Sequence, residues 1–205
     1  MQDFSIDNSE QYFDVLRELG NIGAGNATTA LAEMLQCKVD MKVPQVKLME
    51  FKEVGEAVGG EENVVAGVYL LVEGDITGSM MFLLEEAAAH TLVNKLMGGM
   101  MEPSPDGSFS DMELSALKEI GNIIVGSYLN SLSSLTGMCI YPTPPELAID
   151  MAEAILSVPA IAFGEMGDKM LLIQTQFTDE ETLDGYFILI PDIDSYNKIL
   201  SAIGM

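Results

Sequence analysis

The chain has 205 residues, 48% of them hydrophobic and 20% charged, which is typical of a packed globular protein and excludes a disordered one. Thirty-two acidic against nine basic residues give a net charge of −23, which argues against nucleic acid and anionic membrane surfaces as partners. No apolar run reaches the roughly 18 residues that span a bilayer. The acidic, polar N-terminus is no signal peptide, so we expect a cytoplasmic protein without membrane insertion.

The first predicted element is a long amphipathic helix over residues 13–36. Asp14, Glu18 and Asn21 follow one another at spacings of four and three, so they line one stripe of this helix. Its stretch RELGNIGAGN is unusual, because each glycine inside a helix costs roughly 1 kcal/mol relative to alanine.

Strand patterns follow the helix. An extended segment over 39–51 contains Pro44, and the apolar runs 64–74 and 78–85 are separated by DITG, which predicts a hairpin. A second helical stretch ends at Gly98. Residues 101–110 then read as a linker, which ends at Ser110; Glu113 stands at the capping-box distance from it.

The remainder of the chain repeats this pattern. A helix is expected over 111–136, an extended segment over 138–147, apolar runs over 169–178 and 185–192, and a helical stretch ending at Gly204. At an offset of 101 residues, the first helix and its proline match the second half: Leu16, Glu18, Gly20, Asn21, Ile22, Gly25, Leu31 and Pro44 meet Leu117, Glu119, Gly121, Asn122, Ile123, Gly126, Leu132 and Pro145.

Strands grouped in pairs between helices favour an α+β fold over a doubly wound parallel sheet. We expect one domain over 1–205, made of two half-repeats (about 10–100 and 110–205) that are related by a pseudo-two-fold axis and joined by a linker at 101–110. Such a built-in pseudo-dimer favours a monomer, although the oligomeric state and the strand order stay open.

The cysteines and the histidine of the chain do not indicate a further functional site. Cys37 and Cys139 have no histidine or second cysteine nearby in the sequence, so no metal site is expected, and both are interpreted as buried apolar cysteines. The single histidine, His90, is expected to have a structural or solvent-facing role.

The stripe with its glutamate and asparagine recurs in the second helix as Ser115, Glu119 and Asn122. A solvated helix face would explain one copy, but not the repetition. Nucleophile–histidine pairs and phosphate-binding glycine loops are missing from these helices. A carboxamide can hold a water in line with a phosphorus, and a carboxylate can pair with a cation on a partner.

The glycines beside the asparagines have two readings. Gly20 and Gly121 precede the asparagines and could either allow close packing or leave the surface beside the asparagine clear for another protein. Gly23 has no counterpart in the second half and is left out of the functional argument.

At these residues the chain resembles the CheC/CheX/FliY family of bacterial chemotaxis phosphatases. The family signature is Asp or Ser, three residues, Glu, two residues, Asn, twenty-two residues, Pro, and the chain meets it twice, so it is similar to the stand-alone members with two copies. The matching residues are Asp14, Glu18, Asn21 and Pro44, then Ser115, Glu119, Asn122 and Pro145. The resemblance implies a mixed or antiparallel sheet of about six strands, with two long helices exposed on one side.

The resemblance also implies the activity: a phosphatase (hydrolase) that removes the phosphoryl group from the aspartyl phosphate of the chemotaxis response regulator CheY. Asn21 and Asn122 would orient the attacking water, and Glu18 and Glu119 would pair with the partner's lysine. The supporting residues would be Asp14, Ser115, Pro44, Pro145, Gly20 and Gly121.

The chain would need no cofactor of its own, since Mg²⁺ is expected in the partner's site. A second implied partner is the receptor deamidase CheD, for which the acidic segment 146–156 is the candidate surface. The alternative to a phosphatase is a non-catalytic adaptor that binds CheD or flagellar switch components. The relative activity of the two sites is left open.

Overall fold

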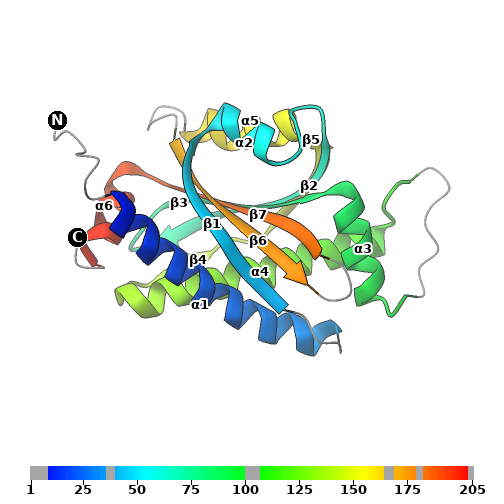
Figure 1. Ribbon diagram of the computed structural model, residues 1–205, viewed down its shortest axis with the longest axis horizontal. Coiled ribbons are helices and arrows are strands. Elements are labelled where there is room, and N and C mark those ends of the chain that lie inside the picture. Colours follow the sequence, from blue (N-terminus) through cyan, green and yellow to red (C-terminus); the bar gives the residue numbers. More distant parts are fainter. Residues whose placement is uncertain (1–8, 36–39, 100–106, 164–168, 179–181, 203–205) are drawn as a thin grey trace.

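The computed structural model describes residues 9–35, 40–99, 107–163, 169–178 and 182–202. In these ranges helices and strands alternate in the same order in both halves of the chain, which confirms the α+β class (Figure 1). In chain order the elements are α1 (Ser9–Leu35), β1 (Asp40–Glu50), α2 (Phe51–Ala57), β2 (Val64–Gly74), β3 (Gly78–Glu85), α3 (Glu86–Leu96), α4 (Asp111–Thr136), β4 (Ile140–Pro142), β5 (Glu146–Met151), α5 (Ala152–Phe163), β6 (Lys169–Thr178), β7 (Thr182–Pro191) and α6 (Ile193–Ala202).

One antiparallel sheet contains all the described strands, in the order β1-β6-β7-β3-β2-β4, and β5 also pairs with β2. Because β4 and β5 pair with successive parts of β2, the seven strands fill six positions, in agreement with the expected number. The order is unchanged when the two halves are exchanged, with β1 replaced by β4 and β5, β2 by β6, and β3 by β7. The sheet is therefore palindromic.

The first strand of each half pairs with a hairpin of the other half. β1 lies against β6, and β4 and β5 lie against β2. The two hairpins meet at the centre of the sheet, where β3 pairs with β7. Each half thus supplies an edge of the sheet to its twin, and every described strand pairing except those within the hairpins joins the two halves.

Both signature prolines lie at equivalent irregularities of the edge strands. The register of β1 shifts between Lys42 and Gln45, so that the segment with Pro44 carries one residue more than its partner strand. The same surplus separates β4, which ends at Pro142, from β5, which begins at Glu146, and this gap contains Pro145. Proline has no N–H for a strand ladder and is tolerated at bulges and edges, so the prolines mark where each edge strand bends. The side chain of Pro44 lies outside the described part of the structure.

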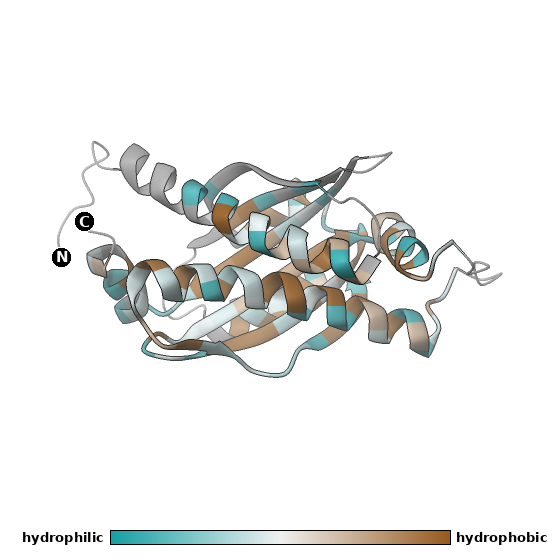
Figure 2. Cartoon of the chain, turned by 90° about the horizontal axis from the view of Figure 1, so that it is seen from below, coloured by the Kyte–Doolittle hydropathy of each residue, from teal (hydrophilic) through white to brown (hydrophobic). Residues whose placement is uncertain are grey.

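Helices cover both faces of the sheet. The long helices α1 and α4 run antiparallel to each other across one face, and α2 and α5 lie on the other (Figure 1). Seen from the side of the long helices, α1 and α4 lie side by side in front of the sheet (Figure 2). The predicted pair of long helices on one side of a six-position sheet is confirmed. Among the described helices, none is both long and apolar enough to cross a membrane.

The alternating faces of the strands produce two apolar clusters. The larger lies between the sheet and the α1–α4 pair, and the smaller lies under α2 and α5. The fully buried centre of the larger cluster includes Leu31, Leu70, Met80, Phe82, Leu117, Ile120 and Ile124.

Two glycines allow the long helices to pack closely. A Cβ at Gly121 would lie 2.7 Å from the side chain of Val68 in β2, so this glycine brings α4 onto the sheet. A Cβ at Gly23 would lie 2.9 Å from the ring of Tyr128, so that glycine brings α1 onto α4. The close-packing reading is therefore correct for Gly121, and Gly23 owes its presence to the helix–helix contact.

Two expectations need correction or extension. Cys139 is exposed, not buried as expected, because it lies in the connection between α4 and β4, which is held through its backbone: its N–H donates to Asp75 Oδ2 and its carbonyl accepts from the Asp75 N–H. The short helices α2 and α5 were missed, since α2 has only seven residues and α5 contains Pro159. Cys37 and residues 101–106 of the linker lie outside the described residues.

Replacing Gly121 with alanine should destabilise the protein, whereas the same change at Gly126 should stabilise it. Overpacking against a rigid β-branched side chain costs about 1–3 kcal/mol, more than the gain in helix propensity. A Cβ at Gly126 would meet nothing within 4 Å, so there only the gain of roughly 1 kcal/mol remains. Urea unfolding of both variants measures the difference, and shifts of the same sign would contradict the packing assignment.

Candidate functional site

The glutamates and asparagines of the signature lie on the two long helices, and the two prolines lie at the irregularities of the edge strands. Glu18 and Asn21 of α1 and Glu119 of α4 are exposed, and Asn122 is half-buried. Ser115 is also exposed. Asp14 lies within α1, but its side chain is outside the described part. The structure thus places each glutamate with its asparagine on one stripe of a helix that is open to another protein.

The start of α4 is fixed by the predicted capping box. The Glu113 N–H donates to Ser110 Oγ, and Glu113 Oε2 accepts from the Ser110 N–H at 2.7 Å. The hydrogen bond from the Ser110 backbone is the main cause that lowers the pKa of Glu113 below its ordinary value, with His90 adding to it. This cap sets the register of the helix turn that carries Ser115.

His90 has a structural role, which is one of the two roles that the sequence predicts for it. The His90 ring stacks on Phe109 with 3.7 Å between ring centroids, and its Nε2 lies 3.0 Å from the Gly107 carbonyl oxygen. Its Nδ1 lies 3.7 Å from Glu113 Oε1. The ring therefore ties α3 and the segment before α4 to the capping box.

The contact between the two helices fixes the two stripes relative to each other. Asn26 Nδ2 donates to Ser131 Oγ at 3.1 Å. The Ser131 hydroxyl in turn donates to the carbonyl of Ser127 at 2.8 Å. Tyr128 is fully buried over Gly23, and this burial raises the pKa of its phenol. Sequence reasoning missed this link, because Asn26 and Ser131 are not equivalent positions of the repeat.

The glycines of the motif separate into two groups. Gly20 and Gly121, directly before the asparagines, are buried. Gly25 and Gly126 lie one turn after the asparagines, and a Cβ at either would meet nothing within 4 Å. No contact within the described residues requires glycine at these two positions, so each leaves a flat, open surface beside its asparagine.

The two stripes are not identical. Ile22, which follows Asn21, is 45% exposed, whereas the equivalent Ile123 is half-buried and packs against the larger core cluster. Lys118, which precedes Glu119, lines a groove together with Ser115. The second stripe is therefore the more embedded of the two and continues into a hollow of the surface.

The chemistry available at each stripe is limited to one carboxylate and one carboxamide. A carboxamide can both accept and donate hydrogen bonds, up to two of each, so it can orient a water. Among the described residues, no group of three histidine, cysteine, aspartate or glutamate side chains could hold a metal ion. Such a surface can complete a reactive centre that another protein carries.

Known proteins share both the sequence and the fold. The sequence model of the CheC-like family matches residues 14–48 and 112–149, which contain the two signature copies. The chain is 37% identical over 198 residues to the CheY-P phosphatase CheC of Bacillus subtilis, and the match covers 95% of each chain. Thermotoga maritima FliY has a similar structure, with a TM-score of 0.75 at 22% identity over 98% of each chain. CheX in the CheX–CheY–BeF3–Mg²⁺ complex from Borrelia burgdorferi gives a TM-score of 0.50 at 18% identity, covering 83% of this chain and 96% of that one.

Changing Glu113 to glutamine should flatten the acid side of the stability profile. Because the folded state lowers the pKa of Glu113, its charge stabilises the fold above the ordinary value of 4.5, and this stabilisation is lost as the pH falls below that value. Glutamine retains the capping hydrogen bond but does not titrate there. Unfolding free energies of wild type and E113Q, measured from pH 7 to pH 3, should converge toward low pH, and parallel curves would contradict the assignment.

Proposed function

The chain belongs to the CheC-like family, and we propose that it is a phosphatase that hydrolyses the aspartyl phosphate of the chemotaxis response regulator CheY. The observation that carries this proposal is the pair of exposed Glu–Asn stripes on α1 and α4, both inside the regions matched by the family. The relative with 37% identity over nearly the full length is named a CheY-P phosphatase. The fold neighbour CheX was solved with CheY, BeF3 and Mg²⁺.

In this proposal Asn21 and Asn122 each orient a water for attack on the phosphorus. The water oxygen forms a bond to phosphorus, the bond to the aspartyl oxygen breaks, and inorganic phosphate and the free carboxylate result. Hydrolysis of this kind needs positioning and charge neutralisation more than a covalent catalyst. Asn21 is exposed, so the water-excluding site forms when the partner covers the stripe.

Glu18 and Glu119 dock the partner by pairing with its lysine. They precede the asparagines by three residues, one turn of the same helix face. The chain needs no cofactor of its own, because the partner contributes Mg²⁺ together with the phosphoryl group. The open positions Gly25 and Gly126 support this arrangement, since they let another backbone approach the asparagines closely.

The second proposed partner, the deamidase CheD, would bind another face. The expected segment 146–156 comprises β5 and the first residues of α5. Farther along α5, Val158 is 51% exposed and Ile161 is 83% exposed. We place the CheD surface on this helix, on the face of the sheet opposite the Glu–Asn stripes (Figure 1). Both partners imply action in the cytoplasm.

The double variant Asn21→Ala, Asn122→Ala should lose the activity. Removing a preorganised polar group from a reactive centre typically lowers turnover roughly 10²–10³-fold, so we expect phosphate release from phosphorylated CheY to approach the spontaneous rate. Each single variant should retain one working stripe. The matched control is Asn130→Ala, an exposed asparagine of α4 outside the motif. Wild-type rates in the double variant would contradict the site, and tight binding without acceleration by the wild type would favour the adaptor alternative.

Ile161→Asp should separate the two partners. A charge at this exposed apolar position should abolish co-purification with CheD, because it opposes burial of the α5 surface. It should leave phosphate release from phosphorylated CheY unchanged, since α5 lies on the other face of the sheet. Undiminished binding of CheD would contradict the placement of this surface.

A further inference from the structure

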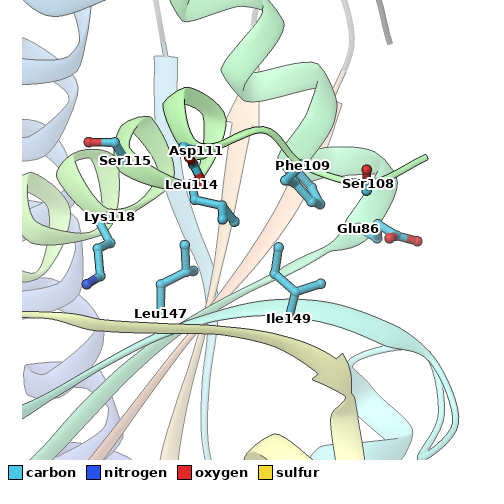
Figure 3. A pocket seen from close by; sticks show the side chains of 9 residues that line it. All are labelled: Glu86, Ser108, Phe109, Asp111, Leu114, Ser115, Lys118, Leu147 and Ile149. Carbon is cyan, nitrogen blue, oxygen red and sulfur yellow. The ribbon is translucent and has the colours of Figure 1, made fainter. Parts of the chain in front are cut away.

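A groove runs between the start of α4 and the sheet edge formed by β5. It has a volume of about 640 Å³. Leu147 and Ile149 point from β5 toward Leu114 and Phe109, so apolar side chains face one another across its middle (Figure 3). Its other lining residues are polar or charged and include Glu86, Asp111, Ser115 and Lys118.

The groove is continuous with the second Glu–Asn stripe. Ser115, one of its lining residues, belongs to the signature and stands four residues before Glu119 on the same helix. Lys118, another lining residue, directly precedes Glu119. A protein that covers Ser115 as well as Glu119 therefore reaches the groove.

Three charged side chains line the groove: the cation Lys118 and the carboxylates Asp111 and Glu86. Lys118 lies beside Leu147 at one end, and Glu86 lies beyond Ile149 at the other (Figure 3). Within the described residues, Lys118 makes no ion pair, although the chain carries 32 acidic residues. Such a half-buried cation, next to apolar walls, suits a ligand that has an apolar side chain followed by a carboxylate.

The sequence of the first half repeats the same residue types. At the offset of 101, Leu114, Lys118, Leu147 and Ile149 correspond to Phe13, Arg17, Val46 and Leu48. Apolar residues at such positions are expected for packing alone. A cation also recurs, since Lys118 corresponds to Arg17 in a chain with only nine basic residues.

We propose that this groove is a docking subsite for the phosphorylated regulator, which inserts an apolar side chain between α4 and β5 and places an acidic side chain at Lys118. This inference rests on the proposed function, because the occupant is the partner that the Glu–Asn stripe acts on. The subsite supplies attraction at short range, because a carboxylate of the partner meets a cation on a chain whose net charge is −23.

The test uses the full-length Asn21→Ala protein, in which turnover comes from the second stripe alone. Lys118→Gln and, separately, Leu147→Thr are added to it. Lys198→Gln is the charge-matched control, since Lys198 lies on α6 and donates to the Asp75 carbonyl. Two quantities are measured over a range of salt concentration: KM and kcat for phosphate release from phosphorylated CheY, and the affinity for CheY activated with beryllofluoride and Mg²⁺.

We expect Lys118→Gln to raise KM and weaken binding roughly fivefold, the size of a single partly exposed ion pair, with kcat unchanged and a smaller salt dependence. Leu147→Thr should weaken binding without changing the salt dependence. Lys198→Gln should change neither. Unaltered KM and affinity in Lys118→Gln would overturn the subsite, whatever Leu147→Thr does to folding.

The remaining outcomes separate the two proposals. Normal hydrolysis by wild type, with no effect of the groove variants, removes the subsite and leaves the phosphatase. Weakened binding in Lys118→Gln, with no hydrolysis by wild type, removes the phosphatase and leaves the subsite. A change of oligomeric state in the groove variants, measured by sedimentation, with unchanged affinity for CheY, would assign the groove to a second copy of the chain and overturn the proposal.

Discussion

The architecture depends on an exchange of edge strands between the two halves of the chain. β1 completes the hairpin that contains β6, and β4 and β5 complete the hairpin that contains β2. This exchange makes one sheet of two repeats, and it brings α1 and α4 onto the same face of that sheet. The two Glu–Asn stripes are consequently held by a common core, and the contact of Asn26 with Ser131 links the helices directly.

The glycines of the long helices illustrate how packing and recognition can share one short motif. Gly121 and Gly23 are needed inside, because a methyl group at either would collide with Val68 or Tyr128. Gly25 and Gly126 face open space, so no contact within the described part of the chain offsets the helix stability that these glycines cost. The many glycines of the long helices therefore serve two purposes. Some let the helix pack closely against the rest of the protein, and others keep the surface beside the asparagines clear.

Much of the fold could be predicted from the sequence, because the two halves of the chain repeat the same pattern of elements. The repeat identified α1, α3, α4 and α6, the two hairpins and the equivalence of the two prolines, and the capping box at Ser110 fixed where α4 begins. Strand order was beyond reach, since periodicity records which side of a strand is buried but not which strand lies next to it. The exposure of Cys139 escaped for a related reason: its position is set by backbone contacts with Asp75, which lies 64 residues earlier and leaves no local pattern.

Pairing of β1 with β6 also sets conditions on how the protein can be made. The residues that pair range from 40–50 at one end to 169–178 at the other, so the first strand to leave the ribosome must wait for nearly the whole chain before its partner exists. Contacts between residues this distant in the sequence slow folding, because the chain loses the entropy of closing a long loop before the contacts stabilise it. An unfinished chain therefore carries unpaired strand edges, the kind of surface that aggregates. The exchange of strands that gives the protein two Glu–Asn stripes thus also means that the first strand can pair only after the last third of the chain has been synthesised.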